Sequence, residues 1–278
     1  MSNDPRRSVI ELTLVGTTFE EDLEFVARAG GHGLGIAESK LRDGEDDQHL
    51  AALRASGLTA TGCIPTAISP LQMSPPNIFG VGPDDPDARV AQMCASVRRL
   101  AAFGADSIAV LTGSGAAFSG DARQVAVEGI REAARVAKDH GTRLVLEPTR
   151  RDLPVDISFV HDIPEAIAFL DEVCEPALGL CYDVFHLWDT DDLLAQTGRH
   201  AGRVFSVQYD YWTTPGELSP DFPEILAALE HGGYAGWYEL EVLRERGQGG
   251  ERAGLPPAEL MKRGWDGFSR AWAGRQPA

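Results

Sequence analysis

The segment LGLCYDVFH, residues 178–186, combines the pattern of a buried strand with two chemically reactive side chains. Continuous apolar runs of this kind are typical of parallel strands that are covered on both faces. The run nevertheless ends on Asp183, and His186 follows three residues later. Burying a carboxylate is costly unless a cation or hydrogen-bond donors meet it. The sequence therefore predicts that Asp183 has a positively charged partner at the end of its strand.

Seven further apolar runs recur along the chain, and helical patterns lie between most of them. The eight predicted strands cover residues 9–15, 34–38, 58–64, 106–111, 143–147, 178–183, 203–208 and 236–242. Predicted helices cover residues 18–30, 88–104, 121–141, 162–173, 219–233 and 256–272, with a weaker one at 189–202. An open doubly wound sheet normally has fewer strands. The count of eight favours an α/β fold, a single-domain (β/α)8 TIM barrel over residues 1–278.

The long irregular stretch at residues 65–87 is too rich in proline and glycine to form a helix. On the predicted barrel it follows the third strand. Long loops in compact domains often serve function, as lids or binding loops. We therefore expect this loop to be a lid or a wall of the substrate site.

Composition excludes several classes of partner. The 278 residues carry a formal net charge of −17, which opposes binding to nucleic acid or to an anionic membrane surface. The N-terminal residues lack the apolar run of a secretory signal, and no stretch reaches the length of a membrane span. Four cysteines lie far apart, without the spacing of a zinc site or a disulfide framework. A cytoplasmic protein with a small-molecule partner is expected.

Oxygen-bearing side chains stand at the ends of four successive predicted strands, at the face where TIM barrels carry their active sites. These residues are Glu147, Asp183, Gln208, and the pair Glu239 and Glu241. Carboxylates brought together repel each other unless a cation lies between them. Oxygen ligands suit Mg²⁺ or Mn²⁺ best. We therefore predict one divalent metal ion, Mn²⁺ or Mg²⁺.

A single carboxylate at a strand end has ordinary alternatives. Asp183 could cap the turn that follows it, and Glu147 could pair with Arg150 or Arg151. The same two arginines could instead hold an anionic group of a substrate. Four strand ends in succession favour the metal site over four separate ion pairs or caps.

Further residues just beyond the strand ends are candidates for contact with a substrate. His186 is the histidine that stands where catalysis could use it, and Arg150 follows Glu147 closely. Trp188 and Tyr209 could wall a pocket of the size of a sugar, although packing beneath the loops is an equal alternative. The predicted substrate-binding residues are therefore His186, Arg150, Trp188 and Tyr209.

Three motifs resemble the sugar phosphate isomerase/epimerase superfamily, the xylose isomerase-like TIM barrels that include family 2 AP endonucleases. They are LVLEP (144–148), CYDVFH (181–186) and GYAGWYELEV (233–242). The resemblance implies that Glu147 binds the metal and acts as acid or base, that Asp183 is a ligand, and that His186 touches substrate. It also implies that Glu241 is the last ligand and the second catalytic carboxylate, with Glu239 one layer deeper.

The seventh predicted strand departs from the family pattern. Gln208 of VQYD (207–210) stands where the family usually has a histidine ligand. An amide oxygen favours Mg²⁺ or Mn²⁺ over Zn²⁺ at that position. A glutamine there also resembles the 3-dehydroshikimate dehydratase branch, but EPTRRD (147–152) lacks the histidine of that branch. The segment YDYWTTP (209–215) lacks the arginine of ketose 3-epimerases, so the subfamily stays open.

The resemblance implies a metal-dependent isomerase or epimerase that acts on a keto-sugar or cyclitol. Glu147 and Glu241 would move a proton next to a carbonyl, through a metal-stabilised enediolate. A lyase is the alternative, either 3-dehydroshikimate dehydratase-like or one that eliminates a β-substituent from an oxidised sugar or glycoside. A non-catalytic barrel subunit is a further alternative, and association into a homo-oligomer is left open. DNA repair is opposed by the acidic charge and by Gln208.

Overall fold

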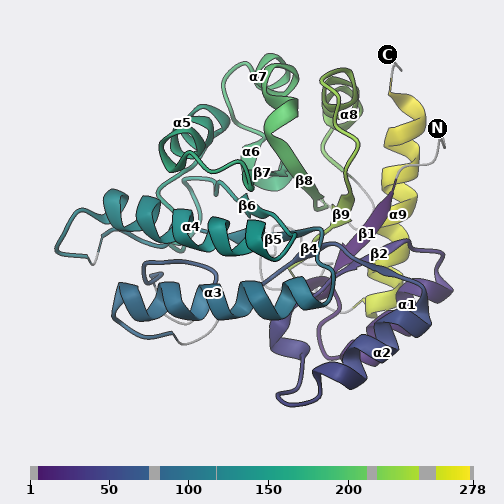
Figure 1. The fold of residues 1–278 in the computed structure, drawn as a ribbon. Helices are drawn as coiled ribbons and strands as arrows, with labels where there is room; N and C mark the ends of the chain where they lie inside the picture. Colours follow the sequence, from purple (N-terminus) through teal and green to yellow (C-terminus); the bar gives the residue numbers. More distant parts are fainter. Residues whose placement is uncertain (1–5, 75–81, 117, 212–217, 244–254, 276–278) are drawn as a thin grey trace.

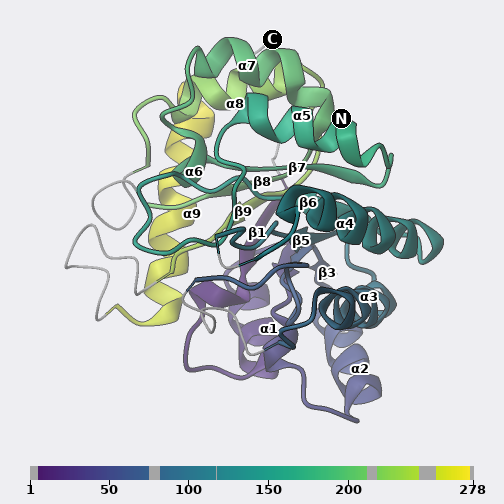
Figure 2. The ribbon, with the colours of Figure 1, turned by 90° about the vertical axis from the view of Figure 1, so that its left-hand side faces the viewer.

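The computed structural model describes residues 6–74, 82–116, 118–211, 218–243 and 255–275, and Figure 1 shows them as a ribbon. Within these residues, parallel strands form a central barrel and helices surround it. Figure 2 shows the same arrangement from the side, with α3, α4 and α5 following one another around the outside. The prediction of an α/β TIM barrel is confirmed.

The elements alternate along the chain as expected for a barrel. The strands are β1 (Arg7–Ile10), β2 (Gly33–Gly35), β3 (Thr59–Ala60), β4 (Gly62–Cys63), β5 (Ser107–Val110), β6 (Leu144–Leu146), β7 (Leu178–Asp183), β8 (Val204–Tyr209) and β9 (Tyr238–Leu240). The α-helices are α1 (Phe19–Arg28), α2 (Asp46–Ser56), α3 (Pro86–Ala102), α4 (Ala122–Asp139), α5 (Ile163–Val173), α6 (Val184–Leu187), α7 (Leu193–His200), α8 (Phe222–His231) and α9 (Pro257–Gly274). Short 3₁₀ helices are η1 (Glu11–Thr13), η2 (Glu38–Lys40) and η3 (Ala201–Arg203).

The third predicted strand is divided into β3 and β4 by an irregularity at Thr61. β3 pairs with β2, whereas β4 pairs with β5. The Thr61 N–H donates to the Leu34 carbonyl at 3.0 Å, and the Thr61 carbonyl accepts from the Ser107 N–H at 3.3 Å. Thr61 therefore bonds to both neighbouring strands and joins the two edges of the sheet, which closes the barrel.

A buried carboxylate from β9 occupies the interior beside this irregularity. Glu239 is 0 % exposed, and its Oε1 accepts the Gly62 N–H at 2.7 Å. The Ser206 hydroxyl donates to its Oε2. Burial raises the pKa of Glu239, while hydrogen bonds from Ser206, Thr61 and Gly62 act in the opposite direction. Glu239 thus ties β4, β8 and β9 together one layer below the strand ends, as the sequence predicted for its depth.

Replacing Gly62 with Ala is expected to destabilise the fold. The added Cβ would overlap the Glu239 carboxylate, which is fixed by its own hydrogen bonds. Overpacking of a tight interior costs about 1–3 kcal/mol. Chemical denaturation should show a loss of this size, whereas Gly198→Ala, in α7 with open space around it, should not lower stability. Equal unfolding free energies for both variants would contradict this description of the barrel interior.

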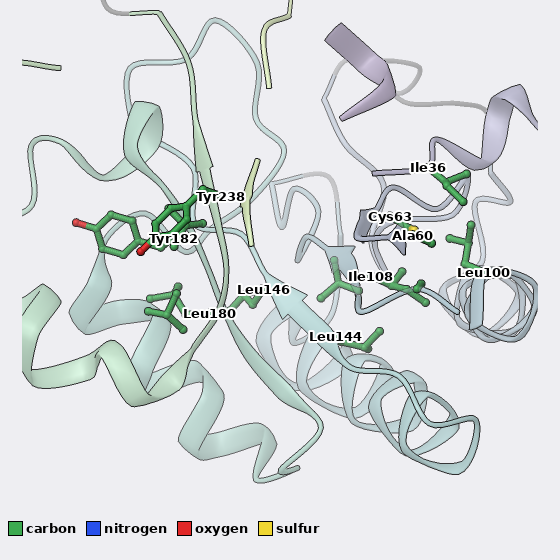
Figure 3. Packing of buried hydrophobic residues seen from close by; sticks show 14 of the residues in the cluster. Ile36, Ala60, Cys63, Leu100, Ile108, Leu144, Leu146, Leu180, Tyr182 and Tyr238 are labelled. Atoms are coloured by element: carbon green, nitrogen blue, oxygen red, sulfur yellow. The ribbon is translucent and has the colours of Figure 1, made fainter. Parts of the chain in front are cut away.

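The main apolar core lies between the barrel and the helices. Figure 3 shows part of it, with Leu144, Leu146 and Leu180 on neighbouring strands and Leu100 on the helix side. Helices α1 and α5 begin directly after the caps that the sequence predicted. Thr18 forms a capping box with Glu21 at the start of α1, and the Asp162 side chain accepts the Glu165 N–H at the start of α5. Such caps satisfy backbone donors that the first helical turn leaves unpaired.

Besides the divided third strand, the first strand and α2 differ from the sequence prediction. The first strand was predicted over residues 9–15, but β1 ends at Ile10 and the chain turns into η1. The turn closes through a hydrogen bond from the Leu14 N–H to the Glu11 carbonyl at 2.9 Å. The helix α2 was not among the predicted helices, since its buried residues in the core are few. Neither difference changes the order of the strands in the barrel.

The turn after β1 contains a buried acidic pair with one ammonium group. Glu11 and Asp22 are both 0 % exposed, and Lys40 forms an ion pair with Asp22. The Ala37 N–H donates to Glu11 Oε2 at 2.8 Å. Burial, followed by a hydrogen bond with Asp22, raises the pKa of Glu11 well above its usual range. With a proton on Glu11, the cluster holds one negative and one positive charge.

Stability is therefore expected to depend on the ionisation of Glu11. A carboxyl whose pKa is raised in the folded state contributes stability below its unfolded pKa, and that contribution is lost as pH rises through the folded pKa. Glu11→Gln imitates the protonated form, so its unfolding free energy should fall less between pH 5 and 8. Each unit of pKa difference corresponds to about 1.4 kcal/mol. Urea titrations at several pH values measure the unfolding free energy. Glu24→Gln on the surface of α1 is the control. Parallel pH curves for wild type and Glu11→Gln would refute the raised pKa of Glu11.

Candidate metal centre

The predicted ligands stand at the carboxyl ends of neighbouring strands. Asp183 is the last residue of β7 and Gln208 lies in β8, opposite Asp183 in the register of the two strands. Glu147 follows β6 directly, and Glu241 follows β9 directly. The side chains of Glu147, Asp183 and Gln208 come from residues that are 8 %, 4 % and 2 % exposed. The strand order β9-β8-β7-β6 therefore brings all four to one side of the barrel mouth.

Three of the ionisable groups form a compact cluster. Ligand atoms of Glu147, Asp183 and His186 all lie within 4.8 Å of one another. The His186 Nε2 is 3.3 Å from Glu147 Oε1 and 3.6 Å from Asp183 Oδ2. The other oxygen of Asp183, Oδ1, accepts the Phe185 N–H at 2.8 Å and caps α6. The capping role considered for Asp183 is therefore present, and it leaves Oδ2 facing the cluster.

The thiol of Cys181 is buried in the barrel interior, near several carboxylates. Burial raises the pKa of Cys181 well above its usual range, and the charges of Glu147, Asp183, Glu239 and Glu241 add to the effect in that order. Glu241 follows β9 directly and lies outside the 4.8 Å cluster. Gln208 contacts the thiol, because its Oε1 accepts a hydrogen bond from Cys181 Sγ at 3.0 Å.

The donor set fits a divalent cation with a preference for oxygen. The carboxylates of Glu147 and Asp183 lie close together in a nearly water-free mouth, where like charges repel strongly, and the partly buried Glu241 follows β9 on the same side of the barrel. Binding a cation relieves this repulsion. The side-chain amide of Gln208 adds a neutral oxygen to the set, and such sets suit Mg²⁺ or Mn²⁺. These four residues could hold the ion that the sequence predicts.

His186 is oriented as a hydrogen-bond donor toward the carboxylates. Its Nδ1 accepts the Arg150 N–H at 3.4 Å, and the imidazole is fully buried. When Nδ1 of a neutral imidazole accepts a hydrogen bond, the proton is carried by Nε2. Nε2 therefore points its proton at Glu147, and His186 orients this carboxylate.

The guanidinium of Arg150 is already engaged by the protein. It forms a two-point ion pair with Asp152, including Nη2 to Oδ2 at 2.7 Å. It also lies over the rings of Phe185 and Trp188, at 5.2 and 5.5 Å from their centroids. Arg150 thus joins the loop after β6 to the α6 region. Trp188 is 39 % exposed at the edge of this stack and remains a candidate for substrate contact.

Two other predicted groups lie away from the mouth. Arg151 pairs with Glu165 at the start of α5. The Tyr209 ring stacks on Phe268 and tilts against Phe222, with centroids 5.1 and 5.5 Å apart, and the residue is 1 % exposed. Successive side chains of a strand face opposite sides. Because Gln208 points inward, Tyr209 points at the helices and is a core residue. The prediction that Tyr209 contacts the substrate is therefore wrong.

The first part of the predicted lid is built into the wall of the mouth. The backbone groups of Ser74 and Asp156 exchange two hydrogen bonds of 2.8 Å, and the Ser114 N–H donates to the Gln72 carbonyl at 2.7 Å. Ile68 and Met73 are buried. Residues 65–74 therefore form a fixed wall, while residues 75–81 lie outside the described residues. Its length and composition marked the segment as a lid or a wall, but its scattered apolar residues did not indicate which of them are buried.

None of the helices in the described ranges is long and apolar enough to cross a membrane.

Comparisons with known proteins agree with the fold. The family described as xylose isomerase-like TIM barrel matches residues 23–270. A protein from Sinorhizobium meliloti 1021 has 19% identity and a TM-score of 0.79, with 96% of this chain and 98% of that chain covered. D-psicose 3-epimerase from Clostridium cellulolyticum H10, solved with D-tagatose, has 18% identity and a TM-score of 0.75, with 96% and 98% covered. The IOLI protein, solved with a zinc atom, has 13% identity and a TM-score of 0.76, with 98% and 100% covered.

Proposed function

The chain belongs to the family of xylose isomerase-like TIM barrels, and on this premise we propose that it is a divalent-metal-dependent isomerase or epimerase of a keto-sugar or cyclitol. The observation that carries the proposal is the row of Glu147, Asp183, Gln208 and Glu241 at the carboxyl ends of the neighbouring strands β6 to β9. Similar structures include an epimerase solved with a ketose and a protein solved with zinc, which supports this choice of substrate and cofactor class.

The proposed ligands are the three carboxylates and the Gln208 amide oxygen. Gln208 in place of an imidazole favours Mn²⁺ or Mg²⁺ over Zn²⁺. When bound, the cation supplies Lewis acidity that polarises a carbonyl and an adjacent hydroxyl and so makes the neighbouring C–H more acidic. The protein contributes a nearly dry mouth in which its charged groups interact strongly, since Glu147 and Asp183 are each less than 9 % exposed.

Glu147 and Glu241 are the proposed acid–base residues. They project from β6 and β9, at opposite ends of the polar row, and so can reach two sides of a bound substrate. One carboxylate accepts the proton from the carbon next to the carbonyl, and the electron pair moves onto the carbonyl oxygen. His186 Nε2–H holds the Glu147 carboxylate in position at 3.3 Å. Such a positioned base contributes about 10²–10⁴-fold to the rate.

The fate of the proton decides the reaction class. Return to the neighbouring carbon gives an isomerase, and return to the opposite face gives an epimerase. Loss of a β-substituent instead would give a lyase, and Gln208 is the residue that favours this alternative, through its resemblance to the 3-dehydroshikimate dehydratase branch.

Proton exchange with solvent tests the proposal without knowledge of the product. The protein, loaded with Mn²⁺ or Mg²⁺, is incubated with a panel of 2-ketohexoses, inososes and dehydroshikimate in D₂O, and deuterium incorporation is followed by NMR or, for Mn²⁺, by mass spectrometry. Metal-dependent exchange next to the carbonyl of at least one compound is expected. The proposal fails if no compound exchanges while metal binding is demonstrated in the same sample.

A further inference from the structure

The mouth of the barrel has two chemically different halves. The polar half is the row of ligands on β6 to β9. We define the apolar wall as Ile10, Ile64, Ile68, Met73, Leu111 and Ile157, which pack together in the barrel interior with Cys181. The strand order places β1, β2, β4 and β5 opposite the polar row.

The register of the strands shows that the two halves form one ring. Val110 pairs with Leu146, so the next residues, Leu111 and Glu147, lie side by side. Val9 pairs with Leu240, so Ile10 and Glu241 are neighbours in the same way. The polar row is therefore flanked at each end by an aliphatic side chain.

The centre of the apolar wall is as accessible as the ligands are. Ile64 and Met73 are each 7 % exposed, compared with 8 % for Glu147 and 4 % for Asp183. Leu153 and Val155, which are partly buried, extend the wall towards the rim. Gly35 pairs with Ile10 and adds no polar group, and a Cβ there would overlap Ile10 and the Gly62 carbonyl.

Polar groups in the loops that carry the wall bond to one another. The Ser69 hydroxyl donates to the Leu71 carbonyl at 2.7 Å, and the hydroxyls of Thr112 and Ser158 are 3.1 Å apart. The two hydrogen bonds between Ser74 and Asp156 hold the loops together. Within the described ranges, which leave out residues 75–81, 212–217 and 244–254, these polar groups are already paired. A substrate hydroxyl placed against the wall would therefore lose its water without gaining one of them as a partner, which costs free energy.

From these observations we infer that the substrate carries a hydrocarbon edge on the side away from the metal. Its reacting hydroxy-carbonyl end faces the polar row, and a methyl or methylene group at the far end meets Met73 and Ile64. The substrate class is a deoxy keto-sugar or a partly deoxygenated cyclic hydroxy-ketone, in place of a fully hydroxylated ketose. The inference rests on the proposed function for the orientation of the reacting end.

Binding of matched ligand pairs tests the inference. Isothermal titration calorimetry on the Mn²⁺-loaded protein compares 2-ketohexoses with their 6-deoxy counterparts. The 6-deoxy member is expected to bind about tenfold more tightly or better, because it avoids burying an unpaired hydroxyl. Met73→Gln should reduce the ratio towards one, and Met73→Leu, which keeps the wall apolar, should preserve it.

Equal affinities, a preference for the hydroxylated member, or no binding of either member of any pair would overturn the inference. Deuterium exchange measured on the same pairs separates it from the proposed function. A binding preference without exchange leaves the apolar wall as a specificity site and removes the proposed chemistry. Exchange without a binding preference leaves the proposed chemistry and removes the hydrocarbon edge.

Discussion

Glu241→Gln is expected to lower the rate of metal-dependent proton exchange by about 10²–10⁴-fold, the contribution of a positioned acid–base group. The change keeps the size of the side chain and its oxygen, but an amide cannot accept the proton. The Glu241 N–H donates to the Tyr209 carbonyl at 3.0 Å, so the backbone at this position is held independently of the side chain. The exchange rate is measured by NMR at saturating metal.

Two variants accompany this measurement. Glu147→Gln should cause a loss of the same order, because the two carboxylates share the proton transfer. Glu259→Gln, in the first turn of α9, replaces an exposed carboxylate and should leave the rate unchanged. A Glu241→Gln rate within about threefold of wild type, against the loss expected for an acid–base residue, would remove Glu241 from the mechanism.

Asp183→Asn is expected to weaken metal binding by about two orders of magnitude or more. Loss of a residue that only orients a ligand lowers metal affinity by about 10–100-fold, and loss of a charged ligand should cost at least as much. Asparagine caps helices as well as aspartate does, so the start of α6 is preserved. The fold should therefore survive while Oδ2 loses its charge. Calorimetric titration with Mn²⁺ gives the affinity.

Asp191→Asn is the matched control, because it removes one negative charge from an exposed position near α6. Its affinity for Mn²⁺ should equal that of wild type. If Asp183→Asn binds Mn²⁺ as tightly as the control, Asp183 serves only as a helix cap.

Much of the fold was predictable from the sequence, because strands covered on both faces consist of continuous apolar runs. The run ending at Asp183 is one example, and β7 covers Leu178–Asp183 as predicted. Caps such as Thr18 and Asp162 mark helix starts through local hydrogen bonds, so they also follow from nearby residues. Glu147, Asp183 and Gln208 could be placed together because parallel strands share one carboxyl edge.

Other features depend on contacts between distant segments. The apolar wall brings Met73 next to Ile157, far apart in the sequence, through the pairing of Ser74 with Asp156. Tyr209 directly follows an inward-facing glutamine in the strand. Because successive side chains of a strand face opposite sides, Tyr209 lies in the core and not in the pocket. The burial of Glu11 depends on Asp22 and Lys40, which reach it only after α1 and η2 have packed.

The position of the metal ion tests the proposed metal site most directly. Crystals grown with Mn²⁺ and measured at the manganese absorption edge give an anomalous map in which the ion itself is identified. We expect one peak coordinated by oxygens of Glu147, Asp183, Gln208 and Glu241, with His186 Nε2 directed at a carboxylate or substrate. A peak bound to His186 Nε2, or no peak at this mouth with Mn²⁺ in excess, would contradict it.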